Sequence, residues 1–167
     1  MKLSDFDIDF IKFKNEKDQF HFEMNNKFFG LKENSLYHSG DIDVAVTCER
    51  NENTISVDYI LNGMVTGESE RCLEDIQLEV KITHNELIKL TSSESLLTEE
   101  NYISIHHPVY NVYDTLYEQV CINMPLRKIC ENSTKKQECK IDDHLSTSTN
   151  EPIEDERWAQ LKKIIKE

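Results

Sequence analysis

Cysteine and histidine are the residue types in this sequence that could ligate a metal ion or act as nucleophiles. Of the five cysteines, Cys72, Cys130 and Cys139 lie near polar segments and could converge on a zinc ion. No two cysteines have the Cys-x-x-Cys spacing that lets one turn present two sulfurs to a tetrahedral metal. We therefore predict no metal and no cofactor, and we regard these three thiols as the candidates for zinc ligands.

No group of residues has the pattern of an active site. A nucleophilic cysteine needs a neighbouring base and a lowered pKa, and the histidines are scattered along the sequence. His106 and His107 are adjacent in a short predicted strand, so they face opposite sides and are poorly placed to share one metal. Glu118 is a lone carboxylate, which has no defined role in acid–base catalysis without a partner. We predict that the protein is not an enzyme.

Apolar residues alternate with polar ones through the first two-thirds of the chain, which predicts a mainly antiparallel β-sheet. The strongest hairpin signal is the pair of alternating segments 42–48 and 55–61, joined by the polar link 50–53. Asn111 and Asp114 have the spacing of a capping box and predict one internal helix over residues 111–121. The expected fold is α+β, with a sheet that could close toward a small barrel. Shorter strands are expected near residues 5–10, 20–24, 64–65, 76–82 and 103–105, and a turn of helix near Phe28.

The sequence divides into a domain, a tether and a terminal helix. A chain of 167 residues with 38% hydrophobic content can bury a core, and we assign a single β-rich domain to residues 1–126. Residues 127–150 contain little to bury and predict a flexible polar tether. Trp158 and Leu161 begin an apolar stripe at helical spacing, which predicts an amphipathic helix over residues 151–167. This helix could pack on its own domain or in the groove of a partner, and both alternatives remain open.

The charge of the chain bears on the kind of partner it binds. Its formal net charge of −13 disfavours unaided capture of a nucleic-acid backbone and suits a basic partner. Five acidic residues surround Arg71 and Cys72 in the sequence: Glu68, Glu70, Glu74, Asp75 and Glu79. They could form a solvated surface, or they could be the docking site of a basic protein. The odd number of thiols, with no leader and no long apolar segment, predicts a reduced cytoplasmic protein without membrane contact.

Three segments in the same order resemble the YceD family, the large ribosomal RNA subunit accumulation proteins, in the version found in Bacteroidetes. GESERCLEDI at 67–76 resembles the family's Cys-x-Arg-Cys-Leu turn, and the segment 110–130 resembles its helix followed by a strand, a proline and a basic pair. EDERWAQLKKI at 154–164 resembles its terminal Asp-Pro-Arg-Trp-x-x-Leu helix. The resemblance covers nearly the whole chain.

The sequence departs from the family pattern at three positions. Ser69 stands where relatives often have the first cysteine, Cys130 where they often have histidine, and Glu156 where they usually have proline. A metal site would thus have lost one ligand and exchanged another. Zinc held by the three thiols would need a fourth ligand, such as His144 or water.

The resemblance implies a non-enzymatic bacterial ribosome-biogenesis factor that supports synthesis, processing or accumulation of large-subunit ribosomal RNA. The expected partner is a basic ribosomal protein or a pre-ribosomal particle, with the RNA contacted indirectly. The candidate partner-binding residues are Arg71, Cys72, Tyr117, Glu118, Arg157 and Trp158. The alternative is direct RNA binding through a local basic surface formed by Lys12, Lys14 and Lys17, or by Arg127, Lys128, Lys135 and Lys136.

Overall fold

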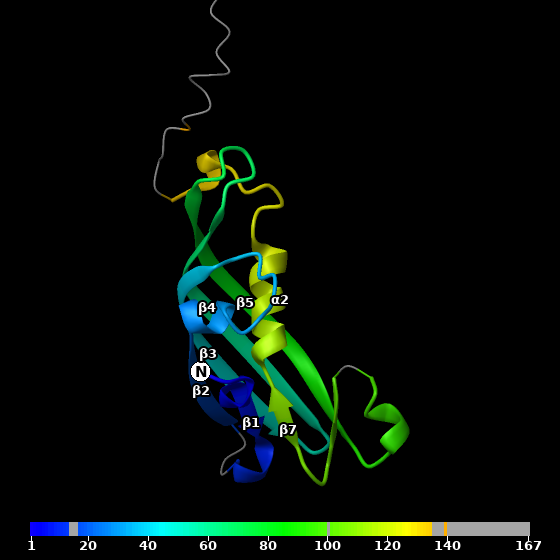
Figure 1. Ribbon diagram of the computed structural model, residues 1–167. Helices are drawn as coiled ribbons and strands as arrows, with labels where there is room; N and C mark the ends of the chain where they lie inside the picture. Colours follow the sequence, from blue (N-terminus) through cyan, green and yellow to red (C-terminus); the bar gives the residue numbers. More distant parts are fainter. Residues whose placement is uncertain (14–16, 100, 135–138, 140–167) are drawn as a thin grey trace, which may run out of the picture. The chain divides into compact units, whose positions relative to one another are not determined.

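The computed structural model describes residues 1–13, 17–99, 101–134 and 139 (Figure 1). The chain divides into two compact units, residues 1–137 and 138–167, and the first contains every helix and strand that is described. The predicted helix over residues 151–167 lies outside the described residues, and so does most of the predicted tether. At the start of that tether, the Thr134 amide donates to the Gln77 carbonyl at 2.9 Å, so residues of the segment 127–134 contact the sheet.

A five-stranded sheet with the order β2-β3-β4-β5-β6 forms the body of the first unit. Its first four strands are antiparallel, and the short β6 runs parallel to the end of β5. The two edge strands, β2 and β6, do not pair with each other, so the described sheet is open. The expectation that the sheet could close toward a barrel is therefore wrong. The strands are β2 (Lys17–Met24), β3 (Ser39–Asn51), β4 (Thr54–Glu68), β5 (Asp75–Thr91) and β6 (Tyr102–Ser104).

The hairpin between β3 and β4 is confirmed, with pairing up to Asn51 and Thr54. Glu52 adopts a positive φ of 45°, which lets two residues reverse the chain. The separate short strand expected at 64–65 is wrong, because β4 continues through Gly63. A Cβ atom on Gly63 would lie 2.1 Å from the Asp41 carbonyl oxygen, so glycine here allows β3 and β4 to stay paired at close approach.

A smaller two-stranded sheet and a helix cover part of the main sheet. β1 (Asp7–Asp9) pairs with β7 (Val109–Asn111), and α2 (Tyr113–Asn123) follows β7 directly, with its residues in contact with β5 (Figure 1). The remaining elements are single turns: α1 (Asn26–Phe29), η1 (Leu3–Phe6), η2 (Phe10–Lys12), η3 (Glu94–Leu96) and η4 (Cys130–Asn132).

The hydrophobic core lies between the main sheet and these covering elements. The predicted alternation places its apolar residues inside, since Val44, Val57 and Val80 on successive strands are at most 1% exposed. Leu116 and Val120 of α2 are fully buried, as their helical spacing predicted. The core also contains an aromatic cluster in which the ring centroids of Phe28 and Tyr113 lie 4.6 Å apart.

The internal helix begins two residues later than predicted. Asn111 is the last residue of β7, where its side-chain amide donates to the Leu3 carbonyl at 2.8 Å. Its carboxamide oxygen accepts from the Tyr113 amide at 3.0 Å, so it does bind the helix start, although Val112 occupies the N-cap position. Asp114 lies 3.4 Å from the Lys32 ammonium.

Candidate functional site

The turn between β4 and β5 carries Arg71 and Cys72, two of the predicted partner-binding residues. Ser69 is fully buried, and its amide donates to the Glu74 carbonyl at 2.8 Å. The Leu73 amide donates to the Ser69 carbonyl at 2.9 Å, with Leu73 at a positive φ of 59°. These two bonds close residues 69–74 into a tight loop that holds the Cys72 thiol at the end of the hairpin.

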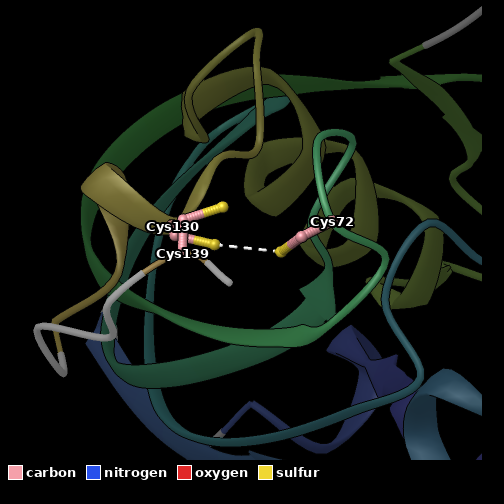
Figure 2. A group of neighbouring side chains, drawn as sticks. All are labelled: Cys72, Cys130 and Cys139. Atoms are coloured by element: carbon pink, nitrogen blue, oxygen red, sulfur yellow. Dashed lines mark hydrogen bonds between the residues drawn. The ribbon is translucent and has the colours of Figure 1, made fainter. Parts of the chain in front are cut away.

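A second segment packs against this turn and brings a second thiol to it (Figure 2). The Glu70 amide donates to the Lys128 carbonyl at 2.7 Å, which places residues 128–130 beside the turn. The sulfur atoms of Cys72 and Cys130 are 3.1 Å apart, and the Cys130 thiol lies 3.7 Å from the Ser69 hydroxyl. Cys130 is buried at 5% exposure.

Two of the three thiols that the sequence offered as zinc ligands, Cys72 and Cys130, meet at this turn. Cys139, the third candidate, belongs to the second compact unit of the chain. No regular spacing in the sequence predicted that Cys72 and Cys130 would meet, because the hairpin turn and the chain after α2 are brought together only by the fold.

Charged side chains of both signs surround the thiols. A pocket of about 540 Å³ beside the turn is lined by Arg71 and Arg127 as well as by Glu70, Ile129 and Glu131. The Arg71 guanidinium lies 3.6 Å from the Glu131 carboxylate.

The acidic residues predicted around Arg71 and Cys72 lie on the surface of this hairpin end. Glu68, Glu70, Glu74, Asp75 and Glu79 are all exposed. The Asp75 carboxylate lies 3.4 Å from the His38 imidazole, and the Glu79 carboxylate lies 2.5 Å from the Lys81 ammonium. Leu73, at the tip between them, is 70% exposed, so the hairpin end presents an apolar side chain within an acidic surface. We call these six residues the hairpin surface.

Tyr117 and Glu118, the other described candidates, are neighbours on α2 but face different ways. The Tyr117 ring is 6% exposed, and its hydroxyl accepts from the Leu36 amide at 2.9 Å. The Lys32 ammonium lies 4.4 Å from the centre of this ring. Tyr117 therefore holds the segment 32–37 in place, and its role toward a partner stays a prediction.

Glu118 is exposed and lines a second, polar pocket of about 420 Å³ between α2 and β5. Glu86, on β5, lines the same pocket and accepts a hydrogen bond from the buried Tyr59 hydroxyl. Burial, together with the neighbouring Glu86 carboxylate, raises the pKa of Tyr59, and burial raises the pKa of Tyr110 to about 12. Both phenols are therefore neutral at physiological pH, and the Tyr59 hydroxyl donates its hydrogen bond to Glu86.

Sequence reasoning missed the contribution of Glu86 to this pocket. The signal was present in the alternation of β5, where His84 and Glu86 take the inward positions between the buried Ile82 and Ile88. Two polar residues at inward positions of a strand indicate a gap in the apolar core. Arg157 and Trp158, the last two candidates, lie outside the described residues.

Comparison with known proteins gives one match. The family model described as "Large ribosomal RNA subunit accumulation protein YceD" matches residues 57–165. This range begins in β4 and includes β5, α2 and the candidate ligands Cys72, Cys130 and Cys139. The comparisons with curated proteins and with solved structures found no match. In the part of the chain that the structure describes, no helix is both long enough and apolar enough to cross a membrane.

Proposed function

Because the chain belongs to the YceD family of large ribosomal RNA subunit accumulation proteins, we propose that it supports accumulation of large-subunit ribosomal RNA in the bacterial cytoplasm. It does so without catalysing a reaction, by binding a basic ribosomal protein or a pre-ribosomal particle that contains one. The family match over residues 57–165 is the observation that carries this proposal. The assignment to the Bacteroidetes version of the family stays a prediction.

The hairpin surface supports a basic partner. It combines five exposed carboxylates with the exposed Leu73, in a chain of net charge −13. Complementary charge speeds the encounter of two proteins, whereas a desolvated apolar anchor slows their dissociation. We expect the carboxylates to govern the association rate and its salt dependence, and Leu73 to govern the dissociation rate.

Neutralising part of the hairpin surface tests this mechanism. The variant Glu68→Gln, Glu70→Gln, Glu79→Gln removes three carboxylates from it, and binding to purified basic large-subunit ribosomal proteins is followed by surface plasmon resonance at several salt concentrations. The matched control, Glu23→Gln, Asp43→Asn, Glu49→Gln, removes three exposed carboxylates from β2 and β3. We expect slower association and a weaker salt dependence for the first variant only. An equal decrease of the association rate in both variants would contradict the mechanism, because it would show that only the total charge matters.

Direct RNA binding is the second candidate, and the pocket that contains Arg71 and Arg127 favours it. Two guanidinium groups near one another suit a phosphate, although Arg71 also lies beside Glu131. A gel-shift assay with large-subunit RNA fragments, with and without a basic ribosomal protein, separates the two candidates. We expect a shift only when the ribosomal protein is present, and a shift with this chain alone would overturn the mediated mechanism.

A further inference from the structure

We propose that two copies of this chain form a dimer through the outer edge of β2, with Lys17 of each copy opposite Glu23 of the other. β2 pairs along one side with β3, and no other described strand pairs with its opposite side (Figure 1). The strand at the other edge of the sheet, β6, has three residues, whereas β2 has eight. β2 is therefore the long edge of the described sheet.

The edge of β2 lacks the features that most often prevent pairing with another chain. Its sequence, KDQFHFEM, contains neither proline nor glycine, and its register with β3 continues through all eight residues without a bulge. Its charged residues lie toward the two ends, so the segment 19–22 is formally uncharged. An open row of backbone amides and carbonyls is a template for another strand unless such features protect it. The unprotected edge thus indicates a strand as its partner.

The hydrogen bonds of the sheet show which backbone groups of β2 point outward. Neighbouring residues of an antiparallel strand direct their backbone groups to opposite sides. The Leu90 amide donates to the Asn53 carbonyl at 2.8 Å, so the even-numbered residues of β5 point toward the β4 side. Carried through the register of the four antiparallel strands, this makes the even-numbered residues of β2 point toward β3. The outward backbone groups belong to Lys17, Gln19, His21 and Glu23.

One antiparallel register pairs all of these outward residues with those of a second copy. It places Phe20 opposite Phe20 of the second copy at a two-fold axis, and Gln19 opposite His21. About eight backbone hydrogen bonds would cross the interface. A shift by two residues in either direction would leave Lys17 or Glu23 without an opposite residue, so this register is the most complete.

The charges of β2 are complementary to themselves in this register. Glu23 lies opposite Asp43 on β3, and a lysine on its other side would relieve this like-charge pair. Lys17 lies opposite Glu49 on β3, so in the dimer it would sit between two carboxylates. The two-fold axis repeats the pair of Lys17 and Glu23 once. This complementarity favours a second copy of the chain as the strand that covers β2.

The inner face of β2 offers apolar surface to the same interface. Phe20 and Phe22 are only half-buried, although Phe20 lies opposite the fully buried Val46 on β3. Phe20 and Phe13, whose ring centroids are 6.1 Å apart, line a pocket of about 280 Å³. In the dimer the two Phe20 side chains would meet at the axis and cover part of this surface.

The test is sedimentation velocity of the full-length chain over a range of protein concentrations. It uses physiological salt, which screens the repulsion between two chains of net charge −13. We expect a dimer whose fraction rises with concentration. Lys17→Glu and Glu23→Lys each place like charges opposite one another twice per dimer, so each should weaken the dimer at least about tenfold.

An equal mixture of these two variants restores both opposite-charge pairs. We expect it to form a heterodimer with about the affinity of the wild type. Lys81→Glu makes the same charge change as Lys17→Glu at an exposed position of β5, and it should dimerise like the wild type. This control separates the local pair from the total charge.

The backbone pairing is tested by His21→Pro, which removes an outward amide from an edge strand, where proline is tolerated. We expect a folded monomer, with the circular dichroism spectrum of the wild type. In the wild type, hydrogen exchange of the Gln19 and His21 amides should slow as the protein concentration rises, because dimerisation covers them.

Three results would overturn the inference. The first is a wild-type chain that stays monomeric at every concentration, even if a basic extended peptide binds to β2. The second is Glu23→Lys protein that dimerises as well as the wild type, since a less acidic chain would do so if only total charge mattered. The third is a His21→Pro dimer. The wild-type measurement needs no variant. β2 shares no residue with the hairpin surface, so the dimer and the binding of a basic protein are tested independently.

Discussion

Among single residues, Tyr37 makes the stability of the domain depend on pH. Burial, followed by the nearby Cys121 and Tyr117, raises the pKa of the Tyr37 phenol to about 12. The folded protein therefore keeps this proton where the unfolded chain releases it. The contribution to stability is complete below about pH 10 and is lost as the pH rises from there toward 12.

Tyr37→Phe should make the protein less sensitive to alkali, because the variant has no phenol to ionise. We expect the free energy of unfolding of the wild type to fall more steeply between about pH 10 and 12 than that of the variant. Urea denaturation at a series of pH values measures this difference. Tyr102→Phe, on β6, serves as the control. Parallel pH profiles for wild type and Tyr37→Phe would contradict the prediction.

Gly63 is a second residue with a sharply defined role. Gly63→Ala places a Cβ atom against the Asp41 carbonyl oxygen, so we expect a loss of about 2–4 kcal/mol in the free energy of unfolding. At Gly30 the nearest atom to a new Cβ is the Asn26 carbonyl oxygen at 3.3 Å, so Gly30→Ala should change stability by less than about 1 kcal/mol. Chemical denaturation of both variants checks the contrast, and equal effects would mean that the β3–β4 pairing tolerates a side chain at position 63.

At the scale of elements, α2 is held by its inner face. Leu116 is fully buried between the helix and the sheet, whereas Ile122 on the same helix is 73% exposed. Leu116→Ala should cost about 2–5 kcal/mol of stability, and Ile122→Ala should stay within about 0.5 kcal/mol of the wild type. Thermal and urea denaturation measure both. A large loss for Ile122→Ala would indicate that its exposed side chain is covered in solution.

The sequence predicted the elements better than their ends. Alternation in segments 42–48 and 55–61 sufficed for the hairpin, because strands that are buried on one face repeat every two residues. It could not show that β4 continues through Gly63, since a glycine in a strand can mark either a break in the strand or a close approach of two backbones. Asn111 was expected to cap the helix, but its carboxamide also binds the Leu3 carbonyl, 108 residues away in sequence.

The candidate site was less predictable than the fold because it depends on long-range contacts. Cys72 and Cys130 are 58 residues apart, and only the packing of segment 128–130 against the hairpin turn brings their sulfurs together. The acidic residues around Arg71 were visible in the sequence because they all lie between residues 68 and 79. Their exposure to solvent could not be predicted, since a single sequence does not show which loops the rest of the chain covers.

At the scale of the whole molecule, the family match and the charge point in the same direction. The chain belongs to a family described by the accumulation of large-subunit ribosomal RNA, and its net charge of −13 suits the basic proteins of a ribosome. We expect association with such a protein to weaken as salt rises, mainly through a slower association rate, because charge acts on the encounter. A dissociation rate that changed with salt while association stayed constant would contradict this.

The most direct test of the central claim is the ratio of large- to small-subunit ribosomal RNA in cells that lack this protein. We predict that the ratio falls, that the wild-type chain and the control variant Glu23→Gln, Asp43→Asn, Glu49→Gln restore it, and that Glu68→Gln, Glu70→Gln, Glu79→Gln at equal abundance does not. An unchanged ratio without the protein, or full restoration by the hairpin-surface variant, would contradict the account.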